Sequence, residues 1–227
     1  MLQLTHIEKT YTTGEIQLQA LRDVNLHIQA GMMVALCGPS GSGKSTLLNI
    51  CGLLNQDYFG EVRFAGELLM RDYRQAMEIR RTHLGFVFQK FNLVPVMTAF
   101  ENVAYPLLLN GLKAVEVKRC VMAMLDHVGL IKFAHYRPDR LSGGQQQRVA
   151  IARALVHQPK LVIADEPTAS LDSETAEQIV ALMKSLGREK ETAFIVASHD
   201  DRMTLHCDKV IHLKDGVIQL EENLCAA

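Results

Sequence analysis

The most informative stretch of the chain is Gly38-Pro39-Ser40-Gly41-Ser42-Gly43-Lys44-Ser45, which fits the phosphate-loop pattern GxxxxGK[ST] at every required position. The residues before it, Met32–Cys37, form a continuous apolar run typical of a strand that is buried on both faces of a parallel sheet. The residues after it predict a helix over about Lys44–Cys51. Strand, glycine-rich turn and helix in this order predict a phosphate-binding site, because backbone N–H groups and a helix N-terminus then face one point.

Each residue type in this stretch has a chemical role in such a site. Glycines let the backbone curl, Lys44 can reach the β- and γ-phosphates of a nucleotide, and the Ser45 hydroxyl can bind Mg²⁺. The alternative is a glycine-rich turn that binds nothing, which the flanking strand and helix disfavour. The candidate nucleotide-binding residues here are Gly38, Pro39, Ser40, Gly41, Ser42, Gly43, Lys44, Ser45 and Thr46.

A second apolar run, Leu161–Ala164, is followed directly by two carboxylates, Asp165 and Glu166. A carboxylate at the carboxyl end of a parallel strand points into the crevice where α/β proteins bind ligands. We expect Asp165 to hold Mg²⁺, largely through water, and Glu166 to polarise an attacking water as general base. An apolar run that ends in Asp-Glu is by itself an ordinary strand end, so this interpretation depends on the phosphate loop.

The remaining pattern predicts a parallel α/β core with a β edge and an inserted helical lobe. Period-two alternation in the first 30 residues indicates antiparallel strands. Buried strands are predicted at Leu84–Phe88 and Ala193–Ala197, and residues 91–158 read as helical throughout, with a final helix capped by Ser142. Near the end, Lys214-Asp215-Gly216 predicts the turn of a hairpin.

Composition excludes several classes of protein. The chain has 227 residues, 48% of them hydrophobic and 22% charged, and a net charge of −1, which argues against a general nucleic-acid binder. No apolar stretch reaches the roughly 18 residues of a transmembrane helix, and the first residues lack a signal-peptide layout. The five cysteines are scattered without a CxxC pair, so we expect reduced packing residues in a cytoplasmic protein.

The segment Leu141-Ser142-Gly143-Gly144-Gln145, with the run Gln146–Leu155 behind it, resembles the signature sequence of ATP-binding-cassette (ABC) ATPases. The resemblance covers essentially the whole chain and implies ATP and Mg²⁺ as ligands. It implies a RecA-like P-loop NTPase core with an antiparallel β subdomain (1–90 and 159–227) and an inserted α-helical subdomain (91–158). Ser142, Gly143, Gly144 and Gln145 would then contact nucleotide.

Further residues take their roles from the resemblance. Gln89 is similar to the Q-loop glutamine that contacts Mg²⁺ or water, Ala169–Asp172 resembles the D-loop, and His199 resembles the switch histidine at the γ-phosphate. Tyr11 lies where the family stacks an aromatic ring on adenine. Taken singly, each has an ordinary interpretation as a solvated loop residue, a helix cap, a surface imidazole or a strand-end tyrosine. The implied catalytic residues are Glu166, His199, Gln89 and Lys44, and the implied metal ligands are Ser45, Gln89 and Asp165.

The resemblance also implies partners. A single copy of each motif implies a head-to-tail homodimer with two composite ATP sites. The segment Phe86–Pro95 and the residues after it look most like the lipoprotein-releasing and macrolide-exporter branch. That branch implies a separate permease with four spans and a large extracytoplasmic domain. The chain would then bind this permease at the cytoplasmic face of the inner membrane. No nucleic acid is expected, and the cargo stays open.

Four alternative functions can be compared with the motifs of this sequence. The ATPase of an importer for amino acids or other polar solutes shares most of these motifs. A soluble ABC protein that acts on ribosomes or DNA usually carries two cassettes or long coiled-coil insertions, and neither is found in this sequence. A small-molecule P-loop kinase would leave Ser142–Gln145 without a role, and an inactive regulatory cassette would not need Lys44, Asp165, Glu166 and His199.

Overall fold

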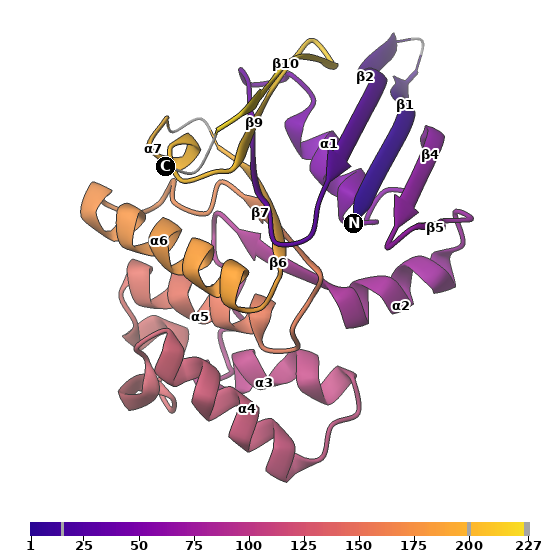
Figure 1. Ribbon diagram of the computed structural model, residues 1–227. Coiled ribbons are helices and arrows are strands. Elements are labelled where there is room, and N and C mark those ends of the chain that lie inside the picture. Colours follow the sequence, from indigo (N-terminus) through magenta and orange to yellow (C-terminus); the bar gives the residue numbers. More distant parts are fainter. Residues whose placement is uncertain (15, 199–200, 225–227) are drawn as a thin grey trace.

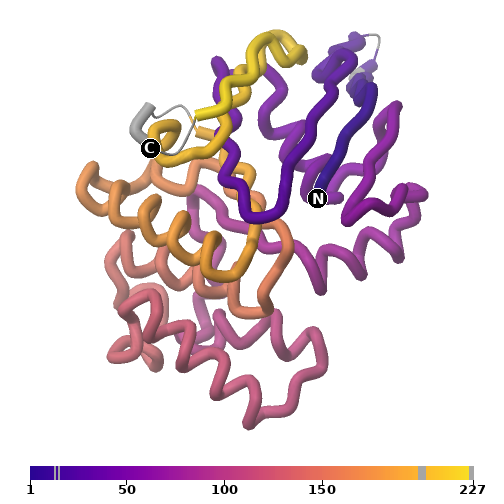
Figure 2. The backbone as a smooth tube through the Cα atoms, viewed as in Figure 1, coloured from indigo at the N-terminus to yellow at the C-terminus, as the bar shows by residue number. Residues whose placement is uncertain are grey.

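The computed structural model describes residues 1–14, 16–198 and 201–224 of the chain. Within these ranges the strands form two sheets, and the helices lie between the sheets and on the outer face of the larger one (Figure 1). Figure 2 shows the same path as a tube, with the helical residues around 100–155 at the end of the molecule opposite the first strands. The α/β architecture predicted from the sequence is confirmed.

The strands and helices have the following bounds. The strands are β1 (Leu2–Thr13), β2 (Ile16–Ile28), β3 (Met33–Cys37), β4 (Phe59–Phe64), β5 (Glu67–Leu68), β6 (Leu84–Phe88), β7 (Leu161–Asp165), β8 (Ala193–Ala197), β9 (Lys209–Lys214) and β10 (Val217–Asn223). The α-helices are α1 (Lys44–Cys51), α2 (Tyr73–His83), α3 (Ala99–Leu109), α4 (Ala114–His127), α5 (Gly143–Leu155), α6 (Ser173–Glu189) and α7 (Asp201–Thr204). Short 3₁₀ turns occupy Ile131–Phe133 and Pro138–Arg140.

The larger sheet has the order β10-β9-β3-β8-β7-β6, with β10 the antiparallel edge strand. Its parallel strands are buried on both faces, as continuous apolar sequences require. Val34 and Leu36 of β3 belong to the core that surrounds α1 and the smaller sheet, whereas Met33 and Ala35 belong to the core that contains α3 to α6. Because β3 and β7 both run parallel to β8, their carboxyl ends lie at the same edge of the sheet, where a ligand site is expected.

The smaller sheet is antiparallel, with the order β2-β1-β4-β5, and it covers α1 (Figure 1). The register of β1 on β2 shifts between Ile7 and Thr10, so the strand is irregular in its middle. The hairpin β9–β10 turns through Asp215 (φ 50°) and Gly216 (φ 78°), the two left-handed residues that an Asp-Gly turn supplies. The antiparallel strands predicted in the first 30 residues and the hairpin predicted near the end are therefore both present.

The prediction that residues 91–158 are helical throughout is wrong for residues 91–98, and also for the connections 110–113 and 128–142, which hold turns and two short 3₁₀ turns. Phe91 (φ 61°) and Asn92 (φ 47°) have left-handed backbone conformations that end any helix there. Arg153 of α5 stabilises this turn because its guanidinium donates to the carbonyls of Phe91 (2.9 Å) and Asn92 (2.6 Å). The first helix of the lobe begins only after Thr98, which caps α3 in a capping box with Glu101.

Among the described residues, no helix combines the length and apolar character that crossing a bilayer requires.

Candidate active site

A cavity of about 910 Å³ opens at the carboxyl ends of β3 and β7. Its volume is near the upper end of the range of about 300–1,000 Å³ that is usual for ligand sites. The sequence-predicted residues that line it are Tyr11, residues 38–41 and 43–46, Gln89, Asp165 and Glu166. The fold therefore gathers residues from the first strand, the phosphate loop and two further strand ends into one place.

The loop between β3 and α1 can take its tight curve only with glycine at particular positions. Gly43 has a φ of 105°, and a Cβ there would lie 2.6 Å from the carbonyl oxygen of Ala20. Gly38 has a φ of 149°, and a Cβ there would clash with the carbonyl oxygen of Leu213. Because these neighbours belong to β2 and β9, the loop is held against the walls of the cavity from two sides.

Lys44 lies across the loop. Its Nζ donates to the carbonyl oxygens of Gly38 (2.7 Å) and Pro39 (3.0 Å). These are neutral acceptors, so the ammonium keeps its full charge available for an anion. Ser42, in contrast, lies behind the loop: it is buried, its N–H donates to the Pro39 carbonyl, and its hydroxyl has no hydrogen-bond partner among the described residues.

The two carboxylates occupy different environments at the end of β7. Burial, and next the charge of Glu166, raise the pKa of Asp165 above its usual value, while Lys44 opposes that shift. Glu166 has a left-handed backbone (φ 49°), which is uncommon for a residue other than glycine. Its N–H donates to the Ala197 carbonyl (3.0 Å) and its carbonyl accepts from the Ala169 N–H (3.2 Å), so the loop holds this conformation at the cavity wall.

Gln89 follows β6 directly and reaches the same cavity. Its carbonyl accepts a hydrogen bond of 3.3 Å from the hydroxyl of Ser170, in the loop between β7 and α6. In the same loop Asp172 caps α6, because its side chain accepts from the backbone N–H and the hydroxyl of Thr175, which lowers the pKa of Asp172. A hydrogen bond thus connects Gln89, at the end of β6, with the loop that follows the two carboxylates.

The segment Ser142–Gln145 does not line the cavity. Ser142 and Gln145 form a capping box at the start of α5, with hydrogen bonds of 3.3 and 2.9 Å. Ser142 and Gly143 are exposed, and a Cβ on Gly144 would lie 2.6 Å from Thr175 of α6. The helix N-terminus therefore presents its N–H groups at the surface. His199 lies outside the described residues.

Six residues of the cavity wall are absent from the sequence-based set: Leu18, Gln19, Ala20, Arg22, Asp215 and Gly216. The last two lie in the predicted hairpin turn, and β9 pairs with β3 directly beside the phosphate loop. The N–H of Arg22 donates to the Gly216 carbonyl (2.8 Å), so the smaller sheet and the turn form one continuous wall. The Asp-Gly turn itself could be predicted from the sequence. Its position in the cavity wall could not, because that depends on β9 lying beside β3 in the sheet.

A second hollow of about 290 Å³ lies between the α2–β6 connection and the helices α3 and α5. It combines apolar and basic side chains, among them Phe86, Phe88, Leu109, Arg80, Arg81 and Arg153. Tyr105, Leu108 and Leu109 of α3 are about half exposed. We refer to this hollow as the α3 groove.

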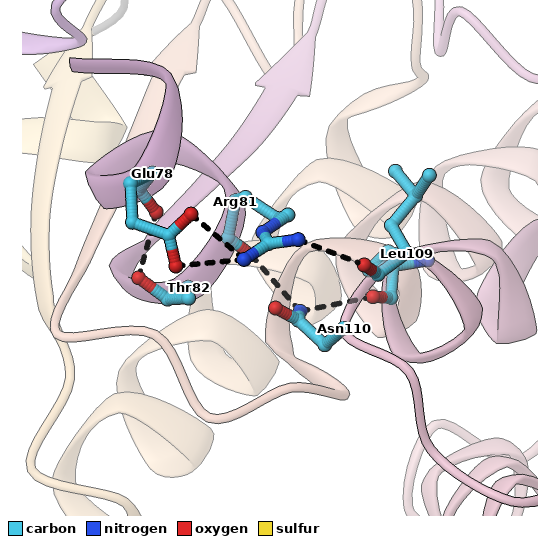
Figure 3. A network of polar contacts seen from close by, with 6 residues as sticks. Glu78, Arg81, Thr82, Leu109 and Asn110 are labelled. Atoms are coloured by element: carbon cyan, nitrogen blue, oxygen red, sulfur yellow. Dashed lines mark hydrogen bonds and ion pairs between the residues drawn. The ribbon is translucent and has the colours of Figure 1, made fainter. Parts of the chain in front are cut away.

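A polar network connects α2 to the end of α3 beside this groove (Figure 3). Arg81 donates to both carboxylate oxygens of Glu78 (2.7 Å each) and to the Leu109 carbonyl (3.4 Å). The Asn110 side-chain amide in turn donates to the carbonyls of Arg81 (3.0 Å) and Pro106 (2.9 Å). These contacts fix the helical lobe to the sheet on one side of the α3 groove.

A family model, related sequences and solved structures all match this chain to ABC transporter ATP-binding proteins. The family model described as ABC transporter matches residues 21–169. The uncharacterized ABC transporter ATP-binding protein MJ0796 of Methanocaldococcus jannaschii is 44% identical over 99% of this chain and 97% of that protein. Its dimeric structure in a post-hydrolysis state bound to ADP and Pi superimposes with a TM-score of 0.90, at 43% identity and complete coverage of both chains.

Two further relatives carry functional names. The lipoprotein-releasing system ATP-binding protein LolD of Shewanella oneidensis is 41% identical over 98% of this chain and 97% of that protein. The macrolide export ATP-binding/permease protein MacB of Photorhabdus laumondii is 42% identical over 96% of this chain, which spans 34% of MacB.

Proposed function

The chain belongs to the ABC transporter family and is an ATP-binding, ATP-hydrolysing cassette, and from this premise we propose that it powers a separate membrane permease of the export type. One observation carries the proposal: the phosphate loop, Gln89 and both carboxylates meet in one cavity, while Ser142–Gln145 lie outside it. Such a chain needs a second copy to complete its site.

The cavity has the donors that a magnesium nucleotide requires. Lys44 and the N-terminus of α1 supply positive charge for the phosphates, and Tyr11 supplies an aromatic ring for the adenine. The oxygens of Ser45, Gln89 and Asp165 are hard ligands of the kind that Mg²⁺ prefers, and all three residues line the same cavity. Bound Mg²⁺ would neutralise charge on the β- and γ-phosphates. It would also offset the repulsion between Asp165 and Glu166, which contributes to the raised pKa of Asp165.

Within this arrangement Glu166 is the general base for hydrolysis. Its backbone conformation, fixed by Ala197 and Ala169, holds this residue in the wall of the cavity that Gln89 also lines. It would accept a proton from water while that water attacks the γ-phosphate, and Lys44 would stabilise the charge that develops on the phosphate oxygens. His199 is retained as the proposed residue at the γ-phosphate on the family resemblance alone.

Dimerisation gives the exposed helix N-terminus a function. Ser142–Gln145 of one copy would face the phosphate loop of the other, so that each ATP contacts both copies. Hydrolysis removes the contacts that the γ-phosphate makes with both copies. The nucleotide then no longer binds the closed dimer more tightly than the open form. Residues 91–158 act as the helical subdomain that moves with the signature segment, and residues 1–90 and 159–227 act as the catalytic core with its β subdomain.

The α3 groove is the proposed docking site for the permease. It lies beside Phe88 and Asn92, on both sides of Gln89, so a change at the γ-phosphate reaches it within a few residues. Its apolar floor and its arginines suit a short helix of the permease that carries apolar and acidic side chains. The names of two relatives, a lipoprotein-releasing ATP-binding protein (LolD) and a macrolide export protein (MacB), favour export over import. A four-span permease and a position at the cytoplasmic face of the inner membrane are proposed from the family resemblance.

The test is capture of the permease by a tagged Glu166→Gln variant with ATP and Mg²⁺ in detergent. Recovery of a four-span membrane protein with a large extracytoplasmic domain supports the export proposal. A permease with five or six spans and a solute-binding protein would move the assignment to import. Recovery of ribosomes, or of no membrane protein, would overturn the transport assignment. A Lys44→Ala chain is the matched control, because it should lose ATP-dependent capture.

A further inference from the structure

Behind Tyr11 lies a buried cation. The side chain of Lys9 is only 4% exposed, and its Nζ lies 4.7 Å from the centroid of the Tyr11 ring. The residue two positions before Lys9, Ile7, is fully buried as well. Lys9 therefore occupies a core position of β1 where an apolar residue is the ordinary choice.

Among the residues that the structure describes, one carboxylate forms an ion pair with the ammonium. Lys9 Nζ donates to Asp57 Oδ2 at 2.6 Å, and this ion pair lowers the pKa of Asp57. The side chain of Asp57 is itself 95% exposed, so the pair consists of a buried cation and a carboxylate at the surface. Burying an ammonium is unfavourable unless it is paired, and the face of the Tyr11 ring is its other favourable contact.

The geometry separates the cation from the nucleotide cavity. Tyr11 lines the cavity of about 910 Å³, whereas Lys9 lines a different hollow of about 230 Å³ together with Asp57. The cation thus approaches the Tyr11 ring from outside the nucleotide cavity. Tyr11 is 39% exposed and lines the nucleotide cavity, so the contact with Lys9 leaves part of the side chain open to a flat ligand.

The same short loop holds Tyr11 at its other end. Asn55 Nδ2 donates to the Tyr11 hydroxyl (3.4 Å), and Asn55 Oδ1 accepts from the N–H of Asp57 (2.9 Å). This loop begins at the carboxyl end of α1, where the N–H groups of Leu54 and Asn55 donate to the Asn49 carbonyl. The helix whose first turn follows the phosphate loop therefore also positions the aromatic ring.

We propose that Lys9 is a positioning residue for the nucleotide base: with Asp57 and Asn55 it fixes the Tyr11 ring in the orientation that stacks on adenine. The inference rests on the proposed role of Tyr11 as the adenine platform. A ring that is fixed before binding loses less conformational freedom when the base stacks on it. Lys9 thereby contributes to affinity for the base and not to affinity for the phosphates.

The experiment compares binding of Mg-ADP with binding of pyrophosphate by titration calorimetry, since pyrophosphate contacts the phosphate loop and has no base. Lys9→Met keeps the length of the side chain and removes the charge. We expect it to weaken Mg-ADP about three- to ten-fold. Pyrophosphate binding should be unchanged, which also shows that the phosphate loop is folded. Lys9→Arg should restore Mg-ADP affinity to within about twofold.

A second route tests the same contact without altering the core position. Asp57→Asn removes the ion-pair partner at the surface, and we expect a smaller loss of Mg-ADP affinity with no loss for pyrophosphate. In a Tyr11→Ala background the additional effect of Lys9→Met should disappear, because the ring through which it acts is gone.

The outcomes separate this inference from the proposed function. Wild-type ADP affinity in both Lys9→Met and Asp57→Asn, with Tyr11→Ala weakened, would overturn the inference and leave the adenine platform intact. Equal losses for ADP and pyrophosphate in Lys9→Met would also overturn it, since the residue would then have a general structural role. No effect of Tyr11→Ala would remove the platform itself, and absence of ADP binding to the wild-type chain would contradict the proposed function.

Discussion

Gln147 of α5 donates a hydrogen bond of 2.6 Å from Nε2 to the carbonyl oxygen of Pro167, the residue that follows Glu166. Gln147 is fully buried, and its Oε1 has no partner among the described residues. This bond joins the helix that begins at the signature segment to the loop that carries the candidate general base. The two halves of the proposed composite site are thus connected inside one chain.

The first prediction concerns Gln147→Leu. The substitution leaves the buried Pro167 carbonyl without its donor, which we expect to lower the free energy of unfolding by about 1–3 kcal/mol. ATP hydrolysis should fall more than nucleotide binding does, because Glu166 lies next to the released carbonyl. Urea denaturation and phosphate release measure the two effects. Gln3→Leu, at an exposed position of β1, is the control and should stay within about 0.5 kcal/mol of wild type; equal stability of both variants would contradict the prediction.

The second prediction compares two glycines with positive φ. Gly43 and Gly111 have φ values of 105° and 76°, but a Cβ at Gly111 meets no atom within 4 Å, whereas one at Gly43 lies 2.6 Å from the Ala20 carbonyl. Gly111→Ala should therefore cost only the conformational penalty of about 1–2 kcal/mol. Gly43→Ala should cost roughly 1–3 kcal/mol more and also weaken pyrophosphate binding. Urea midpoints of the nucleotide-free variants measure the difference, and similar midpoints would refute the steric argument.

Sequence reasoning was most successful where structure depends on neighbouring residues. The buried strand, glycine loop and helix around Lys44, the cap at Ser142 and the Asp215-Gly216 turn are all local patterns, and the structure contains each of them. The carboxylates were also correctly placed in the cavity with the loop, because parallel strands end at one edge of the sheet.

Sequence reasoning failed where distant residues determine the outcome. Residues 91–98 form a turn since Arg153, some 60 positions later, binds the carbonyls of Phe91 and Asn92. The helix α2 buries only Ala76, so its sequence has no apolar periodicity that would reveal it. The cavity wall from Ala20, Arg22 and Gly216 depends on strand order, which the sequence does not specify locally.

The third prediction is that Glu166→Gln slows ATP hydrolysis by about 10²- to 10⁴-fold. The amide keeps the size of the side chain but cannot accept the proton of the attacking water. ATP binding should be retained, and because the γ-phosphate then persists, ATP should shift the chain to a stable dimer. Phosphate release and gel filtration with ATP and Mg²⁺ measure the two effects. Glu177→Gln, on the exposed face of α6, is the control, and wild-type turnover in Glu166→Gln would refute the assignment of the base.

The fourth prediction follows from the raised pKa of Asp165, caused first by burial and then by Glu166. A folded-state pKa above the unfolded value means that the neutral form is favoured in the folded chain. The contribution to stability is therefore fully present below the unfolded pKa of 3.8 and is lost as pH rises through the folded pKa. Asp165→Asn keeps a neutral side chain at every pH. It should melt at a higher temperature than wild type at neutral pH when no nucleotide is bound, and the difference should shrink as pH falls toward about 4.

The same substitution should abolish magnesium-dependent hydrolysis, so that a gain in stability accompanies a loss of function. The reason is that burial and the charge of Glu166 disfavour ionised Asp165, and the proposed magnesium ion would offset both effects. Adding Mg-ADP should therefore raise the melting temperature of wild type by more than it raises that of Asp165→Asn. Thermal unfolding with and without Mg-ADP measures this reversal. Glu177→Gln should behave as wild type, and equal shifts in wild type and Asp165→Asn would exclude Asp165 as a metal ligand.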